Sequence, residues 1–328
     1  MKKEILIFIL LFTISLVSCD KEDTESKKEE TKKIGVTQIV EHPSLDATFE
    51  GFKKALEENG FKEGKNIEYD VQNAQNDQNN SQTIAKNFAG DNLDLILAIS
   101  TPSAQHAFNA IKDIPIVFSA VTDPVGAELV EAFDKPGDNI TGTSDTHPEA
   151  ISKTVSFIMD EIKAKKVGII YNSGEQNSLV QVEKVEELVK EAGGKLVKTT
   201  VANSSDVKQA SESLIGKVDA IYMPTDNTVA SGLEAIIEIA ENNKIPLFAS
   251  DVDSMKRGAV AASGFDYKDL GYETGLMAIP ILKGEKTCSE INVEYPKNFN
   301  LIINKKAAKN QGIKIKEEWS DLGEFYEE

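Results

Sequence analysis

The chain has 328 residues, a formal net charge of −18, 40% hydrophobic residues and 27% charged residues. Its length is sufficient for two domains of about 100–200 residues each. The acidic balance argues against a nucleic-acid partner, because binding to phosphates depends on clustered Lys and Arg.

The N-terminus has the pattern of an export signal. Lys2 and Lys3 precede an apolar run from Ile5 to Val17, and the run ends in Leu-Val-Ser followed by Cys19. The run is too short to span a bilayer, but its length suits a secretory signal. The final four residues resemble a bacterial lipobox, in which the Cys becomes the first mature residue and carries lipid. We therefore expect residues 1–19 to be a lipoprotein signal peptide; an ordinary signal peptide with a chance Cys is the alternative.

A polar stretch separates this signal from the rest of the chain. Residues 20–33 contain no apolar side chain, so they cannot bury enough surface to offset the entropy of ordering. We expect a flexible tether there and a folded part from about Ile34 to Trp319. With Cys19 lipidated, Cys288 is the only other cysteine, which excludes an intrachain disulfide and a Cys-based zinc site.

Strands and helices alternate along the first half of the folded part. Apolar runs predict strands at 32–40, 66–74, 93–100 and 114–121, with helices predicted at 42–60, 81–90 and 101–112. This alternation predicts an α/β fold with parallel sheets and right-handed crossovers. The plan repeats between residues 164 and 253, with matching Ile-Pro-apolar landmarks at Ile114 and Ile245. The repeat favours two Rossmann-like lobes.

Polar clusters follow many of the predicted strands. They are Thr37-Gln38, Ser100-Thr101, Ser119 to Asp123, Asn172-Ser173, Asp226-Asn227 and Ser250-Asp251. Helix capping explains any one such residue. In open α/β sheets, however, ligands bind beyond the carboxyl ends of the strands. Two lobes that face each other would bring these clusters to one binding cleft.

Several segments resemble the tryptophan/tyrosine-binding group of ABC-transporter substrate-binding lipoproteins. The segments are GVTQIVEHPSLDATFEGF, AISTPSAQHAFNAIKDIPIVFSAVTDPVGA, NITGTSD, YNSGEQNS and VDAIYMPTDNTVAS. The resemblance covers nearly all of the chain after the tether. It implies the type I periplasmic-binding-protein fold, with three segments crossing near 143–147, 265–270 and 295–300.

The resemblance also implies lobes, ligand and partners. The N-terminal lobe would comprise 34–144 plus about 268–296, and the C-terminal lobe 145–267 plus about 297–320. The ligand would be an aromatic amino acid, tryptophan first and then phenylalanine or tyrosine. An ABC permease and ATPase complex would be the partner. The protein would be extracytoplasmic and lipid-anchored to the bacterial cell membrane, with no cofactor and no metal.

A free amino acid presents a carboxylate, an ammonium group and a side chain. A carboxylate suits a helix N-terminus and hydroxyls, which favours the group Ser100, Thr101, Ser103, Ser119 and Thr122. The ammonium group requires a carboxylate, for which Asp226 is the first candidate, followed by Asp251 and Asp145.

The ligand side chain requires an apolar slot and, for indole or phenol, a polar partner. The candidates for the slot are Phe118, Tyr171, Tyr222 and Phe265. The candidates for the polar partner are Gln38, His42, Asn172, Glu175 and Asn177, among which the sequence does not choose. Asn227 completes the predicted set of ligand-binding residues.

Other functions have less support in the sequence. None of the three histidines stands in a recognised catalytic motif, so we expect no enzyme. The same body could bind a sugar or nucleoside, although Trp319 is the only Trp and Arg257 the only Arg. It could also report ligand to a membrane receptor instead of a permease.

Overall fold

The computed structural model describes residues 31–297 and 299–327. The predicted signal peptide, Cys19 and residues 20–30 of the predicted tether lie outside the described residues. The described chain forms two α/β lobes, each with a sheet of mainly parallel strands. This confirms the predicted fold class.

The sheet of the N-terminal lobe has the strand order β2-β1-β3-β4-β5, and all of its pairs are parallel. Its strands are β1 (Lys32–Gln38), β2 (Ile67–Asn73), β3 (Leu95–Ile99), β4 (Ile116–Val121) and β5 (Ile140–Ser144). One correction concerns the tether: Lys32 and Lys33 belong to β1 and pair with β2. Backbone pairing in a sheet does not require apolar side chains.

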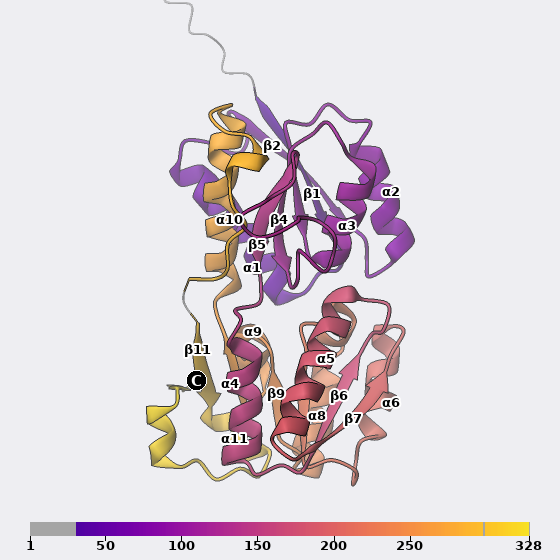
Figure 1. The fold of residues 1–328 in the computed structure, drawn as a ribbon, viewed down its shortest axis with the longest axis vertical. Helices are drawn as coiled ribbons and strands as arrows, with labels where there is room; N and C mark the ends of the chain where they lie inside the picture. The colour runs from indigo at the N-terminus through magenta and orange to yellow at the C-terminus, as the bar shows by residue number, and fades with distance from the viewer. Residues whose placement is uncertain (1–30, 298, 328) are drawn as a thin grey trace, which may run out of the picture. The chain divides into compact units, whose positions relative to one another are not determined.

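Four helices flank this sheet, and one of them comes from far along the chain. They are α1 (Pro43–Glu58), α2 (Gln78–Phe88), α3 (Thr101–Ala110) and α10 (Tyr267–Leu282). Helix α10 packs along α1, although more than 200 residues separate them in sequence (Figure 1). A Cβ at Gly51 would lie 1.9 Å from the carbonyl oxygen of Lys268, and one at Gly271 would lie 1.9 Å from that of Thr48. Glycine therefore permits the close approach of the two helix backbones.

The sheet of the C-terminal lobe has the order β12-β11-β10-β9-β8-β6-β7. Its strands are β6 (Lys166–Tyr171), β7 (Lys195–Thr200), β8 (Ala220–Met223), β9 (Leu247–Ala249), β10 (Ala261–Gly264), β11 (Asn300–Asn304) and β12 (Glu324–Tyr326). Two expectations need correction. Strand β11 is antiparallel to β10, because the chain comes back from the N-terminal lobe and enters this sheet at the end where β10 leaves it. The folded part also extends past Trp319, since β12 pairs with β11.

Helices and turns complete the C-terminal lobe. They are α4 (Ala150–Ser156), a π-helical turn (Phe157–Glu161), α5 (Gln176–Glu191), α6 (Val207–Glu212), α7 (Asn227–Ala230), α8 (Leu233–Asn243), α9 (Val252–Arg257) and α11 (Lys305–Asn310). Short 3₁₀ turns lie at Ser204–Asp206 and Glu317–Asp321. A further 3₁₀ turn, Cys288–Glu290, packs on the N-terminal lobe beside β5. Across the part of the chain that the structure describes, no helix combines the length and the apolar character needed to cross a bilayer.

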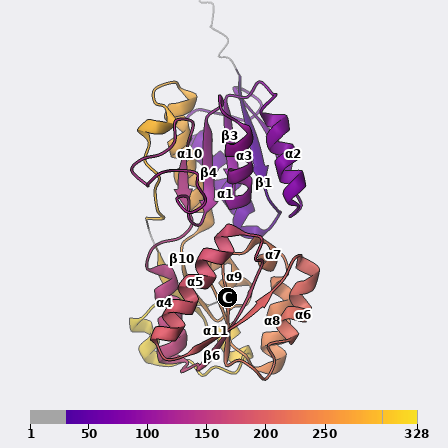
Figure 2. The ribbon, with the colours of Figure 1, turned by 45° about the vertical axis from the view of Figure 1, so that its right-hand side comes forward.

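The chain passes between the two sheets three times. It does so from β5 to α4, from β10 to α10, and from the Cys288–Glu290 turn to β11. Figure 2 shows α7 and α9 at the end of the second sheet that lies nearest to α1. The carboxyl ends of parallel strands and the helix starts that follow them thus meet between the lobes. The boundaries of the two lobes given above stay a prediction.

Candidate functional site

A small cavity lies between the lobes, at the carboxyl ends of their strands. Its volume is about 20 Å³, which is room for about one water molecule. From the strand ends of the N-terminal lobe it is lined by His42, Ser44, Leu45, Thr101, Ala120, Thr122 and Asp145. The rest of the lining is Asn177, Pro224, Thr225, Asp226, Asn227, Ala230, Asp251 and Tyr267.

The wall from the N-terminal lobe contains strained backbone and polar groups without partners. Ser100, between β3 and α3, has φ 85° and ψ 157°, a region that only Gly adopts readily. Its side chain does not cap α3, and the hydroxyls of Ser100 and Ser103 are buried with no hydrogen-bond partner among the residues that the structure describes. Ala120, where the β4–β5 register shifts, has φ 56°. Helix α3 therefore presents an uncapped N-terminus, which is electrostatically positive, next to the cavity.

The wall from the C-terminal lobe is built around the carboxyl group of Glu175. One oxygen accepts hydrogen bonds from the backbone N–H and Nδ2 of Asn227 at 3.2 and 2.6 Å, and from Nδ2 of Asn177 at 3.1 Å. The other accepts from the backbone N–H and hydroxyl of Thr228 at 3.1 and 2.8 Å. Glu175 thus fixes the turn after β8 onto the turn after β6.

Asp226, the first candidate for an ammonium partner, is also engaged within its own lobe. Its carboxylate accepts from the backbone N–H of Asn172 at 2.6 Å, the hydroxyl of Ser178 at 2.6 Å and the backbone N–H of Val229 at 2.8 Å. Burial raises the pKa of Asp226, and the neighbouring Glu175 raises it further. These bonds make Asp226 the cap of α7 and a link to β6.

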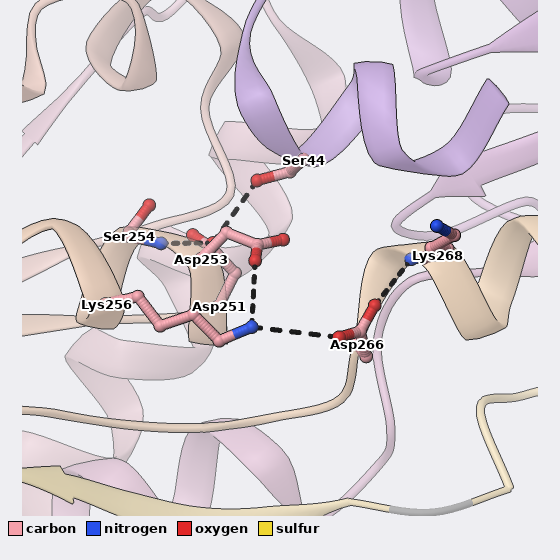
Figure 3. Close-up of polar contacts among 7 residues, drawn as sticks. All are labelled: Ser44, Asp251, Asp253, Ser254, Lys256, Asp266 and Lys268. Atoms are coloured by element: carbon pink, nitrogen blue, oxygen red, sulfur yellow. Dashed lines mark hydrogen bonds and ion pairs between the residues drawn. The ribbon is translucent and has the colours of Figure 1, made fainter. Parts of the chain in front are cut away.

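Asp145 and Asp251 form a second acidic pair, with fewer donors (Figure 3 shows Asp251). Asp145 accepts from the hydroxyl of Tyr267 at 3.1 Å and from that of Thr146 at 3.3 Å. Asp251 accepts from the backbone N–H of Ser254 at 2.8 Å, which caps α9, and from the hydroxyl of Ser44 at 3.4 Å. Burial raises the pKa of Asp145 to about 6, and the charge of Asp251 contributes to this rise.

No ion pair compensates this second pair among the described residues. The ammonium group of Lys256, drawn in Figure 3, contacts Asp253 at 3.4 Å and Asp266 at 3.7 Å instead. Burial and the charge of Asp251 raise the pKa of Asp253 to about 6. The cavity therefore has a positive helix terminus in one wall and uncompensated carboxyl groups in another.

Direct contacts join the two lobes around the cavity. Nδ2 of Asn76, in the loop after β2, donates to the hydroxyl of Thr228 at 2.9 Å. Ser44, at the start of α1, contacts Asp251. The side chain of Asn227 lies within hydrogen-bonding reach of His42, whose pKa burial lowers to about 4. The imidazole of His42 is therefore neutral near pH 7.

The predicted ligand-binding residues divide into two groups. Those that line the cavity are Thr101, Thr122, Asp145, Asn177, Asp226, Asn227 and Asp251. The others lie behind it. Nε2 of Gln38 donates to Val40 and Asp46, and the hydroxyl of Ser119 bonds those of Thr143 and Thr274. Ser100, Ser103, Asn172 and Glu175 support the walls.

None of the predicted aromatic residues lines the cavity. Phe118 and Tyr222 are fully buried in the lobe cores. Tyr171 packs against the core of the C-terminal lobe, and Phe265 lines a separate cavity near the chain crossings. The rings at the interlobe cavity belong to His42 and Tyr267 instead.

Some residues of the cavity were not predicted from the sequence. Ser44 and Tyr267 both lie at helix starts, and Tyr267 reaches the site only because α10 crosses between the lobes. A signal for Ser44 was present: His42-Pro43-Ser44 repeats the polar-Pro-polar pattern of Thr101-Pro102-Ser103 at the start of α3.

Comparisons with known proteins agree on one family. A family profile described as ABC transporter substrate binding protein matches residues 33–323. A protein from Clostridioides difficile (strain R20291) named tyrosine-binding protein is 47% identical over 296 residues, which cover 90% of this chain and 84% of that protein.

Two crystal structures are similar to the described fold. An ABC domain in complex with L-Trp from Streptococcus pneumonia has a TM-score of 0.84 at 34% identity, with 90% of this chain and 99% of that chain covered. The ligand-free, open structure of a substrate-binding protein with adhesive properties from Clostridium difficile has a TM-score of 0.66 at 46% identity, with 90% and 99% covered.

Proposed function

Because the chain belongs to the ABC transporter substrate-binding proteins of the type I periplasmic-binding-protein fold, we propose that it captures an aromatic amino acid for an ABC importer. Proteins of this family bind solutes outside the cytoplasm and are not enzymes. The names of two similar proteins, a tyrosine-binding protein and an L-Trp complex, support tyrosine or tryptophan as the ligand.

One observation carries this proposal: the same cavity offers one group that favours an anion and two carboxylates that favour a cation. The uncapped N-terminus of α3, with Thr101 at the cavity, suits the ligand carboxylate. Asp145 and Asp251, which form no ion pair with any described residue, suit its ammonium group. This assignment replaces Asp226 as the ammonium partner, because Asp226 is already saturated by its own lobe.

We propose further that the ligand enters between parted lobes and is enclosed when they close. A cavity of about 20 Å³ does not admit an aromatic amino acid without movement. The described fold is more similar to the L-Trp complex than to the open structure, despite its lower identity to the former, which supports a closed arrangement. A ligand that contacts both lobes binds the closed form better and shifts the population toward it.

A ligand panel tests the proposed function. Isothermal titration and thermal shift of the body from residue 31 onward, against the twenty amino acids, should favour Tyr, Trp or Phe. Glucose, myo-inositol and adenosine serve as negative controls for the sugar and nucleoside alternatives. Binding of a control solute in place of every aromatic amino acid would refute the proposal.

We also propose that Cys19 carries the lipid anchor and that the residues from Asp20 to the start of β1 connect it to the body, with an ABC permease and ATPase as partners. The support is the lipobox-like Leu-Val-Ser-Cys sequence and the polar segment after it. Buried acyl chains contribute about 0.8 kcal/mol per CH₂, so several chains anchor firmly. In a bacterial host, Cys19→Ala should abolish labelling with radioactive palmitate; retained labelling would refute the anchor.

A further inference from the structure

One amide in the wall of the cavity has an acceptor that no group of the protein satisfies. Asn177, in the first turn of α5, lines the cavity and is 2% exposed. Its Nδ2 donates to an oxygen of Glu175 at 3.1 Å and to the backbone carbonyl of Thr225 at 2.9 Å. Its Oδ1 is buried and has no hydrogen-bond donor among the described residues.

The orientation of this amide is fixed by its neighbours. Exchanging Oδ1 and Nδ2 would place the oxygen against two acceptors, the Glu175 carboxylate and the Thr225 carbonyl, which cannot donate to it. Oδ1 must therefore be the atom without a partner. A buried acceptor without a donor is costly, so this position favours a ligand that brings a donor.

The groups of an aromatic amino acid differ in their ability to fill this position. A carboxylate has no proton to donate. The ammonium group is drawn to Asp145 and Asp251, which lack cationic partners. The remaining donors are the phenol O–H of tyrosine and the indole N–H of tryptophan, and phenylalanine has neither.

We propose that Oδ1 of Asn177 accepts a hydrogen bond from the side chain of the bound amino acid and so selects tyrosine and tryptophan over phenylalanine. This inference rests on the proposed function, and it assigns the selectivity of that site to one atom. A site built to bond a side-chain donor rejects the analogue that lacks it, because its buried polar group is then left unpaired.

A second acceptor in the cavity lies in the opposite wall. Nδ1 of His42 is also buried, with no hydrogen-bond partner in the described part of the chain, and His42 lines the cavity. The side chain of Asn227 is the one hydrogen-bonding neighbour of this ring among the described residues, so the protein fixes the ring less strictly. Asn177 is held by two bonds with one possible orientation, so the observations favour Asn177. His42 is the alternative that the experiment separates.

The experiment is isothermal titration with tyrosine, tryptophan and phenylalanine, and with 1-methyl-tryptophan and O-methyl-tyrosine, which lack the donor proton. On the wild-type protein we expect Kd to rise at least about tenfold from tyrosine to phenylalanine and from tryptophan to 1-methyl-tryptophan. In Asn177→Ala these ratios should fall to near one. The wild-type ligand series tests whether the site requires a side-chain donor, and the variants at Asn177 and His42 assign the acceptor.

Two further variants separate a specific role from a structural one. Asn139→Ala is the control, because Nδ2 of Asn139 is likewise held by two acceptors, the backbone carbonyls of Ile111 and Ile114, away from the cavity. Its ratios should equal those of the wild type. The inference would be overturned if Asn177→Ala weakened all ligands equally and so left the Kd ratios unchanged. It would also be overturned if the ratios were lost only in His42→Ala. If no aromatic amino acid binds the wild type, the proposed function fails as well.

Discussion

Two buried acidic pairs lie at the cavity and in the wall behind it, and their surroundings differ. Glu175 and Asp226 accept hydrogen bonds from backbone and side-chain donors of their own lobe. Asp145 and Asp251 accept fewer bonds, and those of Asp145 come from hydroxyls only. A carboxylate that accepts hydrogen bonds from several donors of its own lobe stabilises that lobe. A carboxylate without a cationic partner favours a cationic ligand group.

The comparison separates a structural role from a ligand-binding role among four carboxylates. Both pairs lie at strand ends, and all four residues are almost fully buried. Only the donors around them distinguish a structural carboxylate from one available to a ligand. Four predictions test this distinction, ordered by the size of the expected effect.

Replacing the saturated carboxylate should affect stability most. We expect Glu175→Ala to lower the free energy of unfolding by about 3–5 kcal/mol, because it leaves several buried donors of Asn227 and Thr228 without an acceptor. Urea denaturation measures the change. Glu187→Ala, at an exposed carboxylate that forms a surface ion pair with Lys184, is the control and should change little. A loss below about 1 kcal/mol would contradict the structural role.

Replacing the unsaturated pair should affect binding instead. We expect Asp145→Asn to weaken binding of the amino acid by about 2–4 kcal/mol, since the ligand ammonium loses a buried partner. The same change should stabilise the free protein at pH 8 by about 1–3 kcal/mol, because it removes a buried charge with a raised pKa. Titration calorimetry and thermal unfolding measure the two effects.

Asp226→Asn is the matched variant for this comparison. It makes the same chemical change in the saturated pair, where the carboxylate caps α7. We expect it to weaken the fold and to change affinity less than Asp145→Asn does. The opposite order of affinities would restore Asp226 as the ammonium partner.

The pH dependence should have opposite signs for stability and for binding. Because the pKa of Asp145 rises from 3.8 to about 6 in the fold, the folded protein binds this proton more tightly than the unfolded chain does. Its contribution to stability is present below pH 3.8 and is lost as the pH rises through about 6. Asp253, with its pKa raised to about 6, adds in the same direction.

Binding of the ammonium group requires the ionised form of Asp145. Affinity should therefore fall as the pH drops below about 6, by up to about tenfold per pH unit. Titrations at pH 5, 6, 7 and 8 measure this slope, and Asp145→Asn should reduce it. A slope that Asp145→Asn leaves unchanged would assign the dependence to another group.

The smallest expected effect concerns the contact that ties the saturated pair to the other lobe. The hydroxyl of Thr228 donates to Glu175 and accepts from Asn76 across the lobes. Asn76→Ala should destabilise closure by about 0.5–1.5 kcal/mol and weaken ligand affinity by up to about tenfold. Asn80→Ala, whose amide bonds only its own lobe, is the control. Equal effects of the two variants would show that the contact does not contribute to closure.

The α/β class and the two lobes followed from the sequence, because apolar periodicity reflects burial within each element. The correction at Lys32 concerns the first residue of a strand, and the added strand β12 lies at a sheet edge; pairing at both places depends on the backbone. The antiparallel direction of β11 could not be predicted from periodicity either, since side chains alternate in the same way in parallel and antiparallel strands.

The candidate site was only partly predictable. Asp226 and Asp145 both stand after strands, and the sequence does not show that Asn172 and Ser178 saturate one of them. Phe118 and Tyr222 lie near strand ends but face the cores, since side chains alternate between the faces of a strand. Tyr267 reaches Asp145 from 122 residues away in sequence, a contact that no local pattern encodes.

The sequence by itself determined which segments become strands and helices, and that polar groups collect at the strand ends, because these follow from the burial and capping of neighbouring residues. Only the tertiary structure decided which carboxylates are hydrogen-bonded by the protein and which are available to a ligand. That division depends on donors brought from distant segments, and hydrogen bonds are made by proximity in space rather than in sequence.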